Sequence, residues 1–329
     1  GGKQNLAAAG SASLSLIRGS TTASIDDATL TGAQLDGQDS PPDATVVAYG
    51  RSRMLTGGGA FYAALGQQGG GFGAAVTVAA IDNDTTARIG GSTLDGFQDV
   101  GVLGLSSSQV LNGAFTGGTG GRAAVGGAFY GTYVGNALAA TVDAGDDRRA
   151  DIDAQGDVTV RAEGVSAFSE LDDELTARDE RGGWLKGASG LTDDNRLDQE
   201  VAHDNDADTG KRSVFEGDIS GEMVLGAALS AQASSQGTAG GLAFGFALVD
   251  TDYEASIGEA DVTAGDALKV DAANNASVIG LAAGAAVGSQ GSFTGSLAAN
   301  VIQADVTARI GAERGDLDAA DYRAVVNAG

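Results

Sequence analysis

A short phrase that recurs along the chain constrains the fold more than any other feature of the sequence. Each copy begins with Ile or Val and ends eight residues later with Ala-Ser-Ile or Ala-Arg-Ile. Four clear copies end at Ile25, Ile89, Ile257 and Ile310. A looser copy, longer by two residues, runs from Val142 to Ile152. The closing isoleucines are 64, 63, 105 and 53 residues apart, so a degenerate unit is expected between Ile152 and Ile257. The pattern predicts stacked units of about 53–64 residues, because one unit this small cannot bury its apolar face alone.

A glutamine close to Gly, and in two copies also to Ser, fixes the register of these units. It stands 20 or 21 residues before the closing isoleucine at Gln4, Gln68, Gln236 and Gln290. The unit near Val142 lacks this glutamine, although its Gly127–Tyr130 segment copies Gly59–Tyr62. Four matches at nearly the same offset indicate internal repetition.

Within each unit the residues alternate with a period of two, which predicts strands rather than helices. In the segment 11–16, Ser alternates with Ala or Leu, and the segments 76–80, 244–248 and 297–301 stand at the equivalent place. A second strand is expected downstream of each phrase, at 157–161, 267–271 and 322–326. Glycines between these runs supply the turns.

The predicted fold class is therefore all-β: a repetitive β-solenoid, similar to a parallel β-helix. Glycine supplies 54 positions, and such small residues allow the close approach and tight turns that a repeating coil requires. The pattern leaves open whether each unit is two or three parallel coils or a long antiparallel hairpin plus a coil.

One polar stretch divides the repeats. We expect about three β-repeat units in residues 1–169, a protruding polar insertion in residues 170–219, and about two more units in residues 220–329. The insertion is densely charged and nearly free of alternation, and insertions in stacked repeats map to loops on one face.

Composition excludes several classes of function. The net charge is −25 with only four lysines, which disfavours nucleic acids and anionic membrane surfaces as partners. The chain has no Cys and one His, which excludes disulfides, thiolate nucleophiles and multi-His metal centres. No run approaches the roughly 18 apolar residues of a membrane helix, so membrane insertion is not expected.

Two candidate contact sites lie within the polar insertion. Asp204, Asp206 and Asp208 alternate before Gly210, with Glu216 downstream, and oxygens in such a loop suit Ca²⁺. The spacing is one residue out of step with an EF-hand loop, so a solvated acidic loop is the alternative. Trp184 is a candidate contact residue, because Trp is favoured at binding hot spots, although it can equally tuck back onto the repeats. No catalytic residues and no certain cofactor are indicated.

Two segments carry a resemblance to a known family. Ile81–Gly90 and Ala260–Val270, set among Gly/Ala-rich alternation, resemble the repeats of giant secreted bacterial adhesins of the filamentous-haemagglutinin-like and leukotoxin-like types. The resemblance covers nearly the whole chain outside the polar insertion. It implies an elongated β-helical shaft at the cell surface, with roles in cell adhesion and biofilm and without catalytic residues.

The resulting expectation is a non-enzymatic structural segment of an extracellular adhesin or cell-surface filament. Its expected partners are neighbouring repeats or identical chains docked end to end, and host-surface or matrix ligands. The alternatives are a β-helical polysaccharide lyase or hydrolase, which needs an acid–base cluster in one groove, and a calcium-dependent surface-layer or matrix protein.

Overall fold

Parallel β-sheets make up the regular structure of this chain. The computed structural model describes residues 5–33, 40–146, 148–164, 222–311 and 325–328, and all regular elements within them are strands. All the strand pairs are parallel, so the described residues form no antiparallel hairpin pairing. The predicted all-β class is confirmed.

Two long sheets and one short sheet contain these strands. Sheet A has the order β1 (Leu6–Asp26), β4 (Gly70–Gly90), β7 (Ala123–Asp143), β11 (Thr238–Ile257) and β15 (Gly291–Ile310). Sheet B has the short strands β2 (Thr29–Thr31), β5 (Thr93–Phe97), β8 (Ala150–Ala154), β12 (Ala260–Ala264) and β16 (Val325–Ala328). Each strand of sheet B follows a strand of sheet A in the chain.

Sheet C contains two intact strands and two divided ones. Its intact strands are β3 (Ala44–Ala63) and β6 (Val100–Gly120). The divided strands are β9 (Val158–Gly164) with β10 (Glu222–Ser234), and β13 (Leu268–Ala273) with β14 (Ala276–Gly288). Both β9 and β10 pair with β6, so the chain leaves sheet C at Gly164 and rejoins the same row at Glu222. The predicted insertion, residues 170–219, lies outside the described residues.

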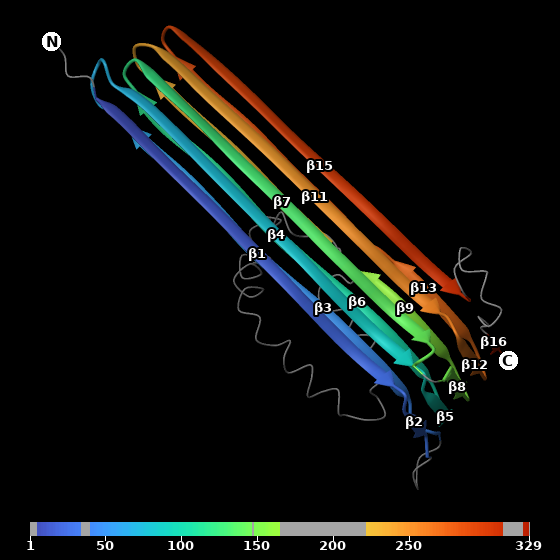
Figure 1. The fold of residues 1–329 in the computed structure, drawn as a ribbon. Helices are drawn as coiled ribbons and strands as arrows, with labels where there is room; N and C mark the ends of the chain where they lie inside the picture. Colours follow the sequence, from blue (N-terminus) through green and yellow to red (C-terminus); the bar gives the residue numbers. More distant parts are fainter. Residues whose placement is uncertain (1–4, 34–39, 147, 165–221, 312–324, 329) are drawn as a thin grey trace, which may run out of the picture.

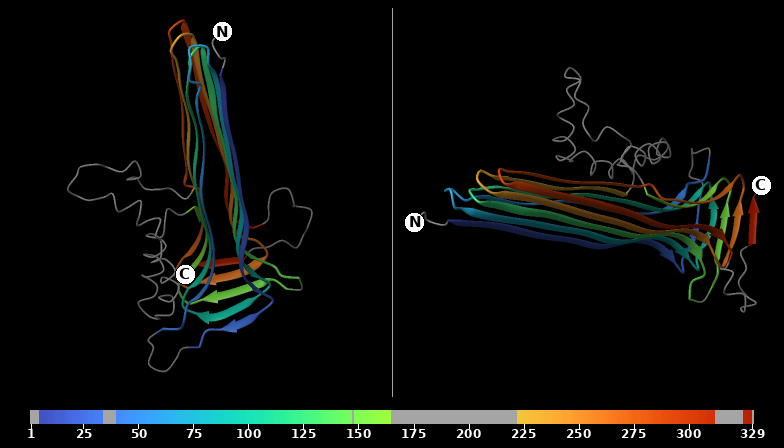
Figure 2. Two further views of the ribbon diagram at one scale, coloured as in Figure 1. Left: turned by 90° about the vertical axis from the view of Figure 1, so that its left-hand side faces the viewer. Right: turned by 90° about the horizontal axis from the view of Figure 1, so that it is seen from above.

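The chain therefore makes successive rounds through sheets A, B and C and begins each new round one strand along (Figure 1). The long sheets A and C face one another, and sheet B lies across one end, which we call the base end (Figure 2). At the opposite end, the turn end, short connections lead from sheet C back to sheet A. These connections stack: the Arg122 amide donates to the Gly69 carbonyl (2.8 Å), and the Gln290 amide to the Gly237 carbonyl (3.1 Å).

The recurring phrase marks one level of sheet A. Its closing residues pair across all five strands in the ladder Ile25, Ile89, Val142, Ile257 and Ile310. The looser copy was therefore misplaced: Val142 closes the third phrase, and Ile152 lies in β8, paired with Leu94 and Val262. A Val in place of the closing Ile concealed the true position.

Two further expectations about the repeats are wrong. Within the described residues, no further unit separates Ile152 from Ile257 in the stack, because β7 pairs directly with β11 in sheet A. The segments Gly59–Tyr62 and Gly127–Tyr130 are not equivalent, since the first lies in β3 of sheet C and the second in β7 of sheet A. Their likeness reflects shared composition rather than shared position.

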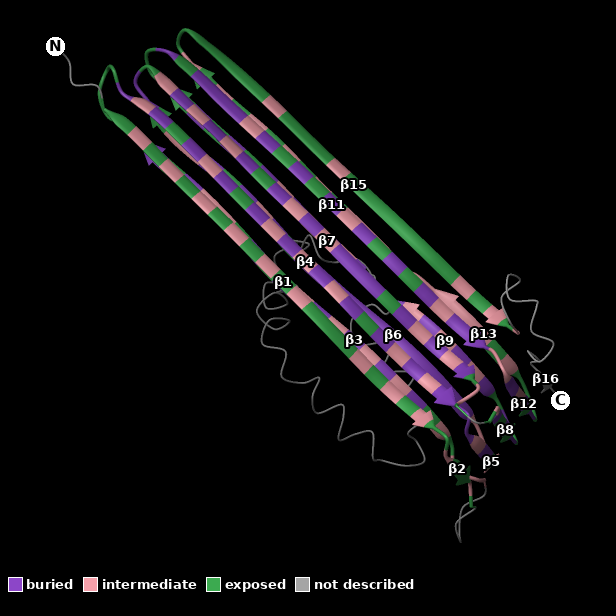
Figure 3. Ribbon diagram, in the orientation of Figure 1, coloured by how far each residue is buried: buried purple, intermediate pink, exposed green. Residues whose placement is uncertain are grey.

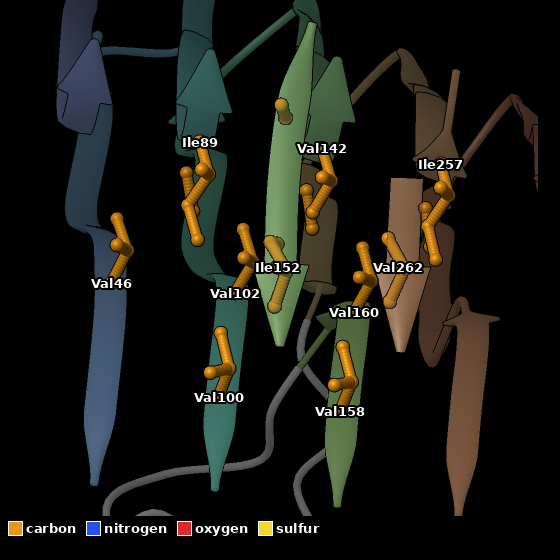
Figure 4. Packing of buried hydrophobic residues seen from close by; sticks show 14 of the residues in the cluster. Val46, Ile89, Val100, Val102, Val142, Ile152, Val158, Val160, Ile257 and Val262 are labelled. Carbon is orange, nitrogen blue, oxygen red and sulfur yellow. The ribbon is translucent and has the colours of Figure 1, made fainter. Parts of the chain in front are cut away.

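A core of branched aliphatic residues fills the base end. Ile89, Val142 and Ile257 from sheet A pack with Val100 and Val158 from sheet C and Ile152 from sheet B (Figure 4). These side chains are almost entirely removed from solvent. Their burial between three sheets gives this end its hydrophobic stabilisation.

We expect Ile89→Ala to lower the free energy of unfolding by about 2–5 kcal/mol, because it leaves a cavity in this core. Leu229→Ala is the matched control: Leu229 is 45% exposed on the outer face of sheet C, so the expected loss is below about 1 kcal/mol. Urea unfolding of both variants measures the difference. Equal losses would contradict the assignment of inner and outer faces.

Candidate interaction surface

Small and hydrogen-bonding side chains fill the space between the long sheets at the turn end. Ala75 and Ala79 of sheet A and Ala228 of sheet C are fully buried there. The Thr116 hydroxyl donates to the Ser230 hydroxyl (3.0 Å), and the Tyr62 hydroxyl donates to the Gln232 side-chain oxygen (2.5 Å). Large aliphatic side chains occupy the base end instead, so the interior changes character along the strands.

The turn-end interior is narrow enough to require glycine beside its tyrosine rings. A Cβ added to Gly226 or Gly245 would lie 2.2 or 2.1 Å from the ring of Tyr130. A Cβ at Gly71 or Gly118 would meet the ring of Tyr62 at 2.1 or 2.4 Å. Each tyrosine therefore occupies a recess that only glycine leaves open, and the two sheets can approach closely.

The large apolar side chains of the turn end point outward from both sheets. Burial alternates along each inner strand (Figure 3), and the outward positions of sheet A include Phe129, Phe244 and Leu297, which are 38%, 42% and 61% exposed. A face of this composition ordinarily turns toward a core. Here the inward face carries the smaller residues.

These outward residues form one continuous patch on each long sheet. Belt A comprises alternate residues of the ranges 8–16, 72–80, 125–133, 240–248 and 293–301, and each is Gly, Ala, Val, Leu, Phe or Tyr. Belt C comprises alternate residues of the ranges 55–63, 111–119, 225–233 and 279–287, where Thr119 is the one polar residue. A contiguous exposed apolar face of this kind indicates a contact surface.

Both belts end at the same level of the molecule. In sheet A the next outward row contains the Arg18–Asp82 ion pair (3.2 Å), and in sheet C the Arg53 Nε donates to the Gln109 side chain (3.0 Å). A hydrogen bond shows that these two rows lie at the same height along the strands. The amide of Asn83, next to Asp82, donates across the interior to the hydroxyl of Ser52, next to Arg53 (2.9 Å). Acidic residues occupy this row and the rows after it on the outer face of sheet A: Asp250 lies in the row of Asp82, and Asp84, Asp252, Glu254 and Asp305 follow.

A buried polar cluster lies inside the molecule next to this boundary. Glu222, which is 0% exposed, accepts hydrogen bonds at Oε1 from Ser106 (3.1 Å), Asn136 (3.1 Å) and the Tyr253 hydroxyl. Asn136 also exchanges hydrogen bonds with Ser108. No described residue donates to Glu222 Oε2.

Burial raises the pKa of Glu222 to about 7, although the hydrogen bonds from Tyr253, Ser106 and Asn136 oppose the shift. Burial, together with the neighbouring Glu222 carboxyl, raises the pKa of Tyr253. Glu222 is therefore about half protonated near pH 7, and the neutral form predominates in the folded chain at lower pH.

We expect Glu222→Gln to remove a pH dependence of stability. The folded chain holds the Glu222 proton more tightly than the unfolded chain, so wild-type stability falls as the pH rises from about 4.5 through about 7. Glutamine keeps an accepting oxygen but cannot ionise, so the variant should be more stable than wild type by about 1–3 kcal/mol at pH 8 and similar at pH 4. Urea unfolding at both pH values tests this; an unchanged wild-type pH profile in the variant would contradict it.

The candidate sites found in the sequence all belong to the predicted polar insertion. Asp204, Asp206, Asp208, Glu216 and Trp184 all lie outside the described residues. Within the described ranges, no three His, Cys, Asp or Glu side chains are grouped as metal ligands. Sequence reasoning missed both belts and Glu222: period-two alternation was visible, but it does not say which face is inward.

Comparisons with known proteins found no matching family model, curated protein or solved structure. In the described part of the chain, no helix has the length and apolar character needed to cross a membrane.

Proposed function

We propose that this chain is a non-enzymatic structural segment of an extracellular bacterial adhesin or cell-surface filament, built as a β-solenoid. The observation that carries the proposal is the ladder from Ile25 to Ile310, in which equivalent residues of successive rounds stand side by side. Each round buries its inward residues against its neighbours, so length is gained by adding rounds. This is the architecture of a shaft.

The resemblance of Ile81–Gly90 and Ala260–Val270 to adhesin repeats supports the extracellular assignment. These segments occupy successive places in a round: the first is the end of β4 in sheet A, and the second covers β12 of sheet B and the start of β13 in sheet C. The residues that carry the family resemblance thus lie in strands of the periodic fold.

The edges of the stack supply the proposed end-to-end contacts. β1 and β15 are the edge strands of sheet A, and among the described strands each has a pairing partner on one side only. An edge strand presents unpaired backbone groups that can pair with a further strand. We propose that neighbouring repeats or identical chains continue the sheets there.

Electron microscopy of the purified full chain tests the structural role. We expect elongated particles that join along the stacking direction, with the spacing of about 4.8 Å between strands that parallel sheets give in fibre diffraction. Isolated, compact particles at all concentrations would contradict end-to-end stacking.

Incubation with uronate-containing polysaccharides tests the absence of catalysis separately. We expect no unsaturated sugar products at any chain concentration. Their release would overturn the non-enzymatic assignment and favour a polysaccharide lyase.

A further inference from the structure

We infer that belt A binds a second copy of this chain, with the strands of the two copies antiparallel. This inference extends the proposed structural role by naming a lateral partner, in addition to the end-to-end contacts along the stack. Four observations carry it: the area of the belt, the shape of its surface, its acidic border, and its position at one end of the molecule.

The area of belt A matches a stable protein interface. It extends from Phe72 to Ala80 along β4 and crosses all five strands of sheet A. At about 3.3 Å per residue and 4.8 Å per strand, its face measures roughly 30 Å by 24 Å, or about 700 Å². A standard interface buries about 800 Å² on each partner.

The surface shape of belt A suits sheet-on-sheet packing. The ring of Phe293 lies over Gly240, where an added Cβ would be 2.0 Å away, and the ring of Phe129 lies 3.4 Å from the corresponding point at Gly131. Because outward glycines accept these rings, the aromatic side chains lie along the sheet instead of standing on it. The result is a level apolar face of the kind that packs against another sheet at about 10 Å.

The surroundings of belt A favour protein over lipid. The rows next to it carry Asp82, Asp84, Asp250, Asp252, Glu254 and Asp305 against Arg18, Arg88 and Arg309, and an acidic border is repelled by anionic headgroups. The edge strands β1 and β15 also present unpaired backbone groups, which hydrocarbon does not tolerate.

The position of belt A sets the orientation of the second copy. The belt covers only the turn end, and the acidic rows cover the outer face beyond it. Parallel copies would place these acidic rows opposite one another, whereas antiparallel copies overlap belt on belt and direct the acidic ends apart. A two-fold axis near Phe129, on the central strand, generates this arrangement and closes it as a dimer.

Sedimentation equilibrium of the full chain at about 1–50 µM tests the inference. We expect the smallest wild-type species to have twice the chain mass of 32.3 kDa, with end-to-end joining adding multiples of this dimer, and Phe129→Asp or Phe244→Asp to raise the dimer dissociation constant at least 100-fold. Thr141→Asp, on the same outer face of β7 but beyond the belt, should leave dimerisation unchanged. Phe115→Asp, in belt C, should also leave it unchanged. Circular dichroism verifies that each variant is folded. Two Phe variants are used so that the test does not depend on one variant that fails to fold.

The orientation is measured with a spin label, since the chain has no native Cys. Ala137→Cys places the label eight residues from Phe129 along β7, so two labels should be roughly 50 Å apart in the antiparallel dimer and under about 25 Å apart in a parallel one. A short separation would overturn the antiparallel arrangement.

Other outcomes overturn the inference more broadly. A wild-type monomer at 50 µM would do so, as would loss of dimerisation in Phe115→Asp but not in Phe129→Asp. Flotation of a monomeric wild type with neutral phosphatidylcholine vesicles, abolished by Phe129→Asp, would assign the belt to lipid. These failures are distinct from failure of the proposed function, because end-to-end particles of Phe129→Asp would still be seen by electron microscopy.

Discussion

The close approach of the two long sheets at the turn end is the constraint on which the rest of the structure depends. Tyr130 fits only because Gly226 and Gly245 lack side chains, and alanines such as Ala75 and Ala243 fill most of the remaining space. Apart from the few large side chains that glycines accommodate, the inward positions of this end carry small or polar residues. The apolar residues that a strand of twenty residues requires are therefore placed on the outside, and the belts follow directly from the thin interior.

Much of the fold could be predicted from the sequence because the repeats preserve the register. Ile25, Ile89, Ile257 and Ile310 were found as equivalent, and the sheet pairs them as one row. The third copy was misplaced, because Val142 packs at that level as the isoleucines do but is not the Ile that ends the other copies.

The sequence could not predict which face of each strand is buried, because Ser alternating with Leu has the same period whichever side is buried. Belts A and C become visible only when the outward residues of several paired strands are aligned. The residues of a single strand do not reveal them. Glu222 was missed for a similar reason: its partners Ser106, Asn136 and Tyr253 come from three other strands.

The buried cluster around Glu222 lies where the two kinds of interior meet. Toward the base end, Ile and Val separate the sheets; toward the turn end, Ala and Gly bring them together. At this level the inward residues Asn83, Ser108 and Asn136 bridge the sheets by hydrogen bonds rather than by bulk. A polar cluster of this kind specifies one alignment of the sheets, because a shift of one row would leave its donors and acceptors unpaired in the interior. The level at which belts A and C end is thus fixed from inside.

Placing the belts outside links the stability of the turn end to association. The base end buries its aliphatic residues within one chain and is stabilised at any concentration. The turn end buries mainly small residues within the chain. The apolar side chains of its outer face stabilise the fold by burial only when a partner covers that face. By mass action, a partner that binds only the folded belt stabilises the fold in proportion to its occupancy. Antiparallel pairing through belt A therefore does more than join two copies: it supplies, between chains, the apolar burial that the narrow interior cannot supply within one.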